Sequence, residues 1–262
     1  MSEEEKNNGK KNTVRIILLI IAIFVLLCSS AYICYYIYNN YMAGKEYEEL
    51  TSTTQSATTA QNLAENPIDF ESLKAQNDEI YAWIKVEDTD VDYPIVQSKT
   101  DDEFYLKHSA IDKSWLESGA IYTEGANSID FSDPITVIYG HNGYKETMFT
   151  TLHNFEKQEF FDSHPYFYIY QPQRKLTYQV ISAFKYDDRH IMNSFNFYAG
   201  DDLNNFQQMI LDPSSPVRNV RQNLDKTIDK NSKIVVLSTC ITGQKSNRYL
   251  ICGVLVKDEK TN

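Results

Sequence analysis

The sequence predicts a mainly β protein: a closed or nearly closed β-barrel with a few added helices, preceded by one apolar helix. About eight segments rich in Val, Ile and Tyr recur along the chain, and Gly, Pro, Asp and Asn bound them, as is typical of strands. Few segments have a helical pattern, and many strands with few helices indicate a barrel. One uncharged segment near the N-terminus is long enough to cross a bilayer.

The composition fits one domain of ordinary size with appendages, because the chain has 262 residues. Hydrophobic residues make up 42% of the chain and aromatic residues 13%, which is enough to build a core. The formal net charge is −11. We therefore expect no nucleic-acid partner, since phosphate binding needs a basic face.

The apolar segment covers residues 16–38 and carries no charge. A helix of this length spans the hydrocarbon core of a membrane. Only Lys45 follows the segment closely, whereas four cations precede it: Lys6, Lys10, Lys11 and Arg15. Because the positive flank stays inside, we expect residues 1–15 in the cytoplasm, a single-pass anchor at 16–38 and the remaining chain outside the membrane.

Two other interpretations of this segment involve processing. Ser29, Ser30 and Ala31 are small residues with the spacing of a signal-peptide cleavage site. A lipoprotein signal would end at Cys28, but Leu27 precedes it where a small residue is expected. The apolar run continues past these positions, which favours an uncleaved anchor.

Residues 39–66 have the composition of an extracytoplasmic stalk, because Ser, Thr, Gln and Ala fill their centre and cannot bury a core. The globular domain is then expected at 67–262. At its start, Asn66 and Pro67 resemble the cap and first turn of a short helix that ends near Asp78.

Strands dominate the rest of the chain. Two further helices are predicted, at roughly 147–161 and at 201–211, where Asp-Pro-Ser-Ser closes the second. The predicted strands are Ile80–Val86, Tyr93–Gln97, Ala120–Thr123, Ile135–Tyr139, Tyr166–Tyr170, Lys175–Tyr186, Lys233–Thr239 and Arg248–Lys257.

The four cysteines do not form a disulfide framework. Cys28 and Cys34 lie inside the apolar segment, so only Cys240 and Cys252 remain in the outer part. An oxidising exterior favours their pairing, whereas a catalytic thiol must stay reduced. Both states of this pair remain open from the sequence.

Three chemically active side chains fall at the ends of predicted strands. Cys240 ends an apolar run, His141 follows a strand through Gly140, and Arg248 opens the last strand. Rigid scaffolds present functional groups in this way. Each also has a structural interpretation, because free cysteines are usually buried and an arginine can serve a surface ion pair. The other histidines have no distinguishing context: His108, His153, His164 and His190.

Several motifs resemble the class B sortases. VLSTC at 236–240 is followed by Arg248 eight residues beyond the cysteine, and YGHN occupies 139–142. The similarity extends from about Pro67 to Val256, together with the apolar N-terminus. One departure is Val236, where the family motif usually begins with Thr. Three longer segments agree in order and spacing: WIKVEDTDVDYPIVQSKTDDEFYL (83–106), SGAIYTE (118–124) and ETMFTTL (146–152).

The resemblance implies an eight-stranded sortase barrel at 67–262, fixed to a Gram-positive membrane. Such cysteine transpeptidases cut the C-terminal sorting signal of a secreted protein after Thr, and join it to an amine of a lipid-linked peptidoglycan precursor. Carried over, Cys240 would be the nucleophile, His141 the general acid/base, and Arg248 the group that orients substrate and stabilises the oxyanion. No metal or cofactor is implied. The implied walls of the peptide groove are Leu106, Tyr139, Ile191 and Ser238.

Two other functions compete with this interpretation. An L,D-transpeptidase-like peptidoglycan enzyme would carry a Ser-x-Gly-Cys pattern, but Ser238 and Thr239 precede Cys240 without a glycine. An inactive membrane-tethered binding module would lack part of the catalytic set, and all three residues are present. A papain-like protease lacks its cysteine context here, and no Cys–His pair has the spacing of a metal site.

Overall fold

The computed structural model describes residues 17–38, 41, 63–143 and 146–261. The chain divides into two compact units, Met1–Met42 and Ala43–Asn262. The predicted cytoplasmic segment at 1–15 and most of the predicted stalk lie outside the described residues.

In the first unit, Ile17–Tyr38 forms a helix of 22 residues with a mean hydropathy of 2.8. It is long and apolar enough to cross a membrane. The hydroxyls of Ser29 and Ser30 donate to the carbonyls of Val25 and Leu26, each at 2.8 Å. These bonds satisfy the two hydroxyls within the helix itself.

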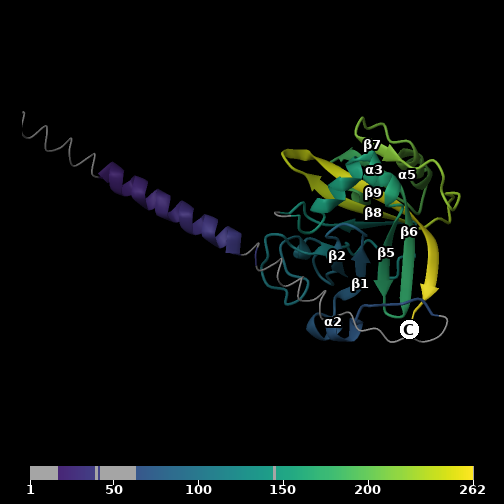
Figure 1. Ribbon diagram of the computed structural model, residues 1–262, viewed down its shortest axis with the longest axis horizontal. Coiled ribbons are helices and arrows are strands. Elements are labelled where there is room, and N and C mark those ends of the chain that lie inside the picture. Colours follow the sequence, from purple (N-terminus) through teal and green to yellow (C-terminus); the bar gives the residue numbers. More distant parts are fainter. Residues whose placement is uncertain (1–16, 39–40, 42–62, 144–145, 262) are drawn as a thin grey trace, which may run out of the picture. The chain divides into compact units, whose positions relative to one another are not determined.

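The second unit is a β-barrel (Figure 1). Hydrogen bonding joins the strands in the order β5-β1-β2-β3-β4-β8-β9-β6, and pairing of β6 with β5 closes a ring of eight. A ninth described strand, β7, adds to β6 outside this ring. The predicted eight-stranded barrel is confirmed. The strands are β1 Ile80–Lys85, β2 Asp92–Val96, β3 Ile121–Tyr122, β4 Ile135–Tyr139, β5 Tyr166–Gln171, β6 Arg174–Asp187, β7 Arg218–Val220, β8 Ile234–Ile241 and β9 Gln244–Lys260.

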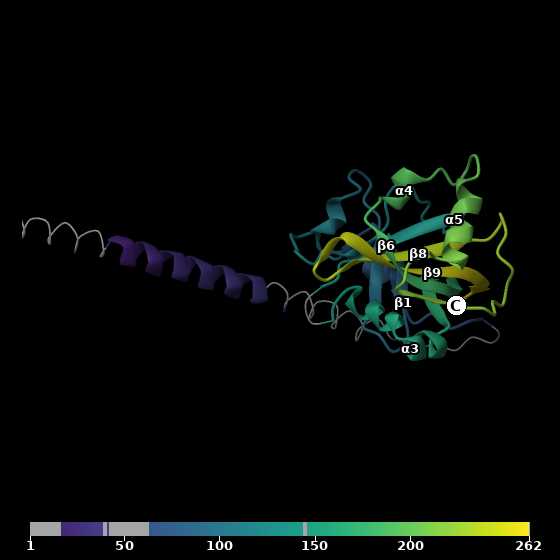
Figure 2. The same ribbon diagram turned by 90° about the horizontal axis from the view of Figure 1, so that it is seen from above.

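Strand β8 is buried on both faces, which explains its unbroken apolar run. Val235 and Leu237 belong to the large core cluster, whereas Ile234 and Val236 belong to a second cluster. Successive side chains of a strand point to opposite faces. The second cluster includes Phe206 of helix α5 (Asp202–Leu211). Figure 2 shows α5 and the short helix α4 (Ile191–Ser194) beside β6, β8 and β9.

The first helix of the barrel domain is shorter than predicted. Helix α2 covers Phe70–Gln76, and Asp69 caps it by accepting the backbone N–H of Ser72 at 3.0 Å. Asn66 was therefore wrongly predicted as the cap. Its side chain accepts the N–H of Ile68 and donates to the carbonyl of Gln171, so it ties the incoming chain to β5.

The predicted helix at 147–161 is two elements. A 3-10 helix, η2, covers Thr150–Glu156, and α3 covers Gln158–Ser163. Lys157 separates them because its backbone is extended, with φ −82° and ψ 122°. Residues 144–145, just before this region, lie outside the described residues. The prediction of a helix at 201–211 is confirmed by α5.

Cys240 and Arg248 lie inside paired strands, not at their ends. Strand β8 continues to Ile241 and β9 begins at Gln244, so two residues form the turn between them. Gly243 occupies the left-handed region with φ 74°, which few other residues adopt readily. The sequence prediction ends β8 two residues too early, at Thr239, and starts β9 four residues too late, at Arg248, because the residues beside the turn are mostly polar although they pair as strands.

Candidate active site

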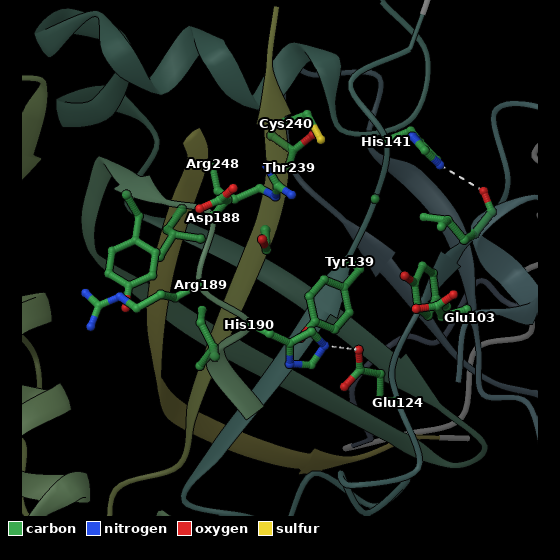
Figure 3. Close-up of a pocket in the computed structure, with 17 residues that line it drawn as sticks. Glu103, Glu124, Tyr139, His141, Asp188, Arg189, His190, Thr239, Cys240 and Arg248 are labelled. Carbon is green, nitrogen blue, oxygen red and sulfur yellow. Dashed lines mark hydrogen bonds and ion pairs between the residues drawn. The ribbon is translucent and has the colours of Figure 1, made fainter. Parts of the chain in front are cut away.

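A pocket of about 270 Å³ opens on the outer face of β4, β8 and β9, continuing the face that α4 partly covers. All seven predicted site residues border it (Figure 3). They come from four regions of the chain that lie far apart in sequence. These residues are Leu106, Tyr139, His141, Ile191, Ser238, Cys240 and Arg248.

Strand register brings the three reactive side chains together. Cys240 is directly opposite Arg248 in the antiparallel pair β8–β9. Opposed residues of such a pair place their side chains on one face. Strand β4 runs parallel to β8, with Tyr139 opposite Ser238. His141 comes two residues after the end of β4, so it lies at the same end of the barrel as Cys240.

The turn into His141 requires glycine at position 140. A Cβ on Gly140 would lie 2.6 Å from Ile121 Cδ1 and 2.6 Å from the Phe149 ring, which is closer than real Cβ contacts. The chain can therefore pass from β4 into this loop only without a side chain at that position. The His141 ring is half-buried, and its Nε2 lies 2.8 Å from the carbonyl oxygen of Leu106.

The Cys240 thiol is exposed and free, whereas the Cys252 thiol is free and fully buried in the second core cluster. Burial raises the pKa of Cys252 well above its ordinary value. Cys252 lies opposite Val236, four residues before Cys240 on β8. The disulfide that the sequence left open is not formed, and Cys240 is the accessible thiol of the pocket.

Arg248 is a half-buried cation without a carboxylate partner. Its Nη1 donates to the carbonyls of Lys245 and Asn247 at 3.0 and 3.1 Å. Within the described residues, no Asp or Glu forms an ion pair with it. Its remaining N–H groups are therefore available on the pocket side. A thiol, an imidazole and a guanidinium on one rim can perform acyl transfer through a thioester.

Comparison with known proteins supports the same chemistry. A sortase domain model matches residues 84–256. The chain belongs to the sortase family. It is 27% identical over 205 residues to sortase B of Listeria monocytogenes, which covers 78% of this chain and 80% of the relative.

Solved structures place this sortase in class B. Clostridium perfringens sortase B is similar with a TM-score of 0.64 at 27% identity, over 72% of this chain and 100% of that one. A Staphylococcus aureus sortase B–substrate complex is similar with a TM-score of 0.61 at 27% identity, over 72% and 84%. Class B sortases are cysteine transpeptidases, so the L,D-type and non-enzymatic interpretations are set aside.

The sortase pocket also contains a buried carboxylate that the sequence analysis missed. Glu124 accepts from Nε2 of His190 at 2.7 Å, and the His190 ring lies 5.9 Å from that of Tyr139. Burial raises the pKa of Glu124, and the His190 hydrogen bond offsets only part of this rise. Nothing local marks this pair, because 66 residues separate its members.

A second missed group lies behind the nucleophile. The Cys240 carbonyl oxygen is 3.0 Å from Asn142 Nδ2 and 3.0 Å from His153 Nε2. On its other nitrogen, Nδ1, His153 is 2.7 Å from Glu156 Oε1. The sequence shows Asn142 only as part of the YGHN motif and gives His153 no distinguishing context, because both contacts span more than 80 residues.

Proposed function

We propose that this sortase cleaves the C-terminal sorting signal of secreted proteins after Thr, and joins the new carboxyl end to an amine of a lipid-linked peptidoglycan precursor. The observation that carries the proposal is the register of the rim: Cys240 opposite Arg248, with His141 at the end of the adjacent parallel strand. The similarity to a sortase B that forms a substrate complex supports a peptide substrate.

In the first half-reaction, the Cys240 thiolate attacks the Thr carbonyl carbon. A C–S bond forms, the scissile C–N bond breaks, and His141 in its charged form protonates the leaving amine. In the second half-reaction, the acceptor amine attacks the thioester and passes a proton to His141. A new C–N bond forms, and the Cys240 thiolate is released.

Arg248 stabilises the oxyanion of both tetrahedral intermediates. Its guanidinium keeps its charge at any relevant pH and offers several N–H donors in a plane. Two backbone carbonyls hold one nitrogen, and this leaves the other donors for substrate. A donor fixed before the reaction avoids reorganisation when negative charge develops.

The peptide groove is formed by Leu106, Tyr139, Ile191 and Ser238. Leu106 and Tyr139 are half-buried and offer apolar surface to the peptide, whereas Ile191 and Ser238 are 3% and 6% exposed and contribute mainly shape. His141 is bonded to the Leu106 carbonyl, so this loop links the groove to the acid/base group.

The N-terminal helix acts as an uncleaved single-pass anchor. The satisfied hydroxyls of Ser29 and Ser30 make the helix compatible with hydrocarbon, and the basic flank before residue 16 favours a cytoplasmic N-terminus. The catalytic domain then lies outside the membrane, where secreted proteins and lipid-linked precursors meet.

The test is Cys240→Ala in the full chain, assayed with an internally quenched peptide library in which Thr is fixed before the scissile bond. We expect no cleavage and no acyl-enzyme by mass spectrometry, with an unchanged thermal melt because the exposed thiol fills no core space. Cys252→Ala is the matched control and should retain cleavage. Cleavage by Cys240→Ala would assign the nucleophile elsewhere.

A further inference from the structure

We propose that His153 is a positioning residue for the nucleophile: its imidazole bridges Glu156 and the Cys240 carbonyl oxygen and thereby fixes the end of β8. This inference rests on the proposed function, because it takes Cys240 as the nucleophile. The hydrogen bond of His153 to Cys240 is to the backbone carbonyl oxygen, so His153 is not assigned a part in the chemical steps.

The first argument concerns the sheet ladder beside Cys240. The Ser238 carbonyl accepts from the N–H of Gly140 at 3.1 Å, which continues the pairing of β8 with β4. Carbonyls two residues apart point to the same side of a strand, so the Cys240 carbonyl also faces β4. At that level the chain has left the sheet, because Asn142 forms a bridge with Met148 instead.

Two side chains replace the missing backbone donor. Asn142 Nδ2 and His153 Nε2 each lie 3.0 Å from the Cys240 oxygen. A strand-end carbonyl without a ladder partner would otherwise depend on water. The last residues of β8, which include Cys240, are therefore held by side chains from outside the strand.

The second argument is that both ring nitrogens of His153 have partners. Nδ1 lies 2.7 Å from a Glu156 carboxylate oxygen, and Nε2 lies 3.0 Å from the Cys240 carbonyl oxygen. Asn142 Nδ2 lies 3.3 Å from Nε2, and it lies 3.0 Å from both the Cys240 oxygen and Thr242 Oγ1. A proton on Nε2 makes His153 a donor to the Cys240 carbonyl.

The third argument is that the His153 ring contacts both strands of the β8–β9 hairpin. His153 stacks on Tyr249 with ring centroids 5.1 Å apart and an interplanar angle of 26°. Tyr249 is buried on β9, next to Arg248 and opposite Thr239. The titratable groups that face His153 are thus Glu156 from η2, Tyr249 from β9 and Cys240 from β8.

The test compares His153→Leu, which cannot donate, with His153→Gln, whose amide can donate to the same carbonyl. Both are made in the full chain in detergent micelles. We expect His153→Leu to lower kcat about tenfold with KM within about twofold, because small displacements of a reacting group reduce rate more than binding. His153→Gln should recover to within about threefold of the wild type.

The matched control is His164→Leu. His164 forms a similar pair with Asp88 at 2.9 Å and stacks on Phe160, but among the described residues it has no hydrogen bond, ion pair or ring stacking with β8 or β9. Its kcat should equal that of the wild type. Thermal melts of all variants separate loss of positioning from loss of folding.

Two measurements need no substrate. Hydrogen exchange of the peptide that spans 238–242 should be about tenfold faster in His153→Leu and near wild type in His153→Gln. Nitrogen NMR of histidine-labelled protein should show a proton on Nε2 of His153, the nitrogen that faces the Cys240 carbonyl. If the wild type cleaves no peptide but these two results hold, the proposed function fails while the positioning role stands.

Three outcomes would overturn the inference: a kcat for His153→Leu within twofold of wild type, no recovery in His153→Gln, or an Nε2 of His153 that carries no proton in the NMR spectrum.

Discussion

Two imidazole–carboxylate pairs border the reactive rim. In one pair the carboxylate is the more buried member, and in the other it is the imidazole. In the pocket, the His190–Glu124 pair buries its carboxylate and exposes its imidazole, with side-chain exposures of 11% and 41%. Behind the nucleophile, the His153–Glu156 pair buries the imidazole, at 22%, more than the carboxylate, at 42%. Both nitrogen–oxygen distances are 2.7 Å. The pairs differ only in what surrounds them.

The second nitrogen decides what each ring can be. In His190, Nδ1 accepts the backbone N–H of Asn193 at 3.3 Å, so a neutral ring with its proton on Nε2 satisfies both contacts. In His153 the second nitrogen faces a carbonyl oxygen instead. The same pair of residue types therefore presents its second ring nitrogen to a backbone N–H in one place and to a backbone carbonyl in the other.

The largest expected effect comes from Arg248, the cation on the pocket side. We predict that Arg248→Lys lowers the rate about 10²-fold or more, nearly as much as Arg248→Ala, because an ammonium cannot reproduce a planar fork of donors. Cleavage of a sorting-signal peptide measures this, with thermal melts alongside. Near-normal activity of the lysine variant would show that Arg248 acts only through its positive charge and that its planar set of donors is not required.

A smaller effect is expected at Asn142, the second donor to the Cys240 carbonyl. Asn142→Ala should lower kcat about fivefold to tenfold, because one of two donors to the strand end is lost. Asn142→Asp, which has nearly the same shape, should lose more, since it places a carboxylate oxygen against the carbonyl. Equal kcat values for the two variants would show that the size of the side chain matters and its donor does not.

Glu124→Gln should leave kcat within about twofold, because the His190 N–H can donate to the amide oxygen as well. Its signature is in stability. The pKa of Glu124 is raised by burial, so the wild-type fold loses stability as pH rises from about 4.5 through the folded pKa. The variant has no carboxyl group at this position and lacks this loss. In urea unfolding, the free energy of unfolding of the variant relative to the wild type should therefore be higher at pH 8 than at pH 4. An equal difference at both pH values would contradict the raised pKa of Glu124.

The smallest effect is expected at Tyr249, on which His153 stacks. Its hydroxyl is buried and has no hydrogen-bond partner in the part of the chain that the structure describes, so Tyr249→Phe keeps the ring and removes an unsatisfied group. Activity should stay within twofold, and stability should change by no more than about 1 kcal/mol, towards a more stable fold. A large loss of activity would mean that the hydroxyl itself acts at the rim.

The sequence was most informative where burial dictates pattern. Residues 135–139 form β4 with the predicted ends, because apolar side chains there are buried on both faces. It was least informative where polar groups pair across the fold. Glu124 and His190 have the composition of any surface loop, and only the barrel brings them together. Likewise, Asn66 has the features of a helix cap, but β5 binds its side chain instead.

The site shows the same division. Strand-end logic and family motifs led to Cys240, His141 and Arg248, and the structure brings these to one pocket, while their roles stay predictions. The groups that hold them were not predictable. His153 is visible as a partner of Cys240 only once η2 packs against the β8–β9 hairpin.

The bridge between Ala64 and Thr261 determines where the chain enters the barrel domain relative to the reactive rim. Ala64 donates to the carbonyl of Lys260, so the chain enters the barrel domain beside the end of β9. Arg248 lies near the other end of this strand, twelve residues away, which is roughly 40 Å in extended conformation. Figure 1 shows the β8–β9 turn and the C-terminus at opposite ends of the domain. Within the barrel domain, a peptide beside Cys240 would therefore lie about one strand length from the point where the chain enters the domain.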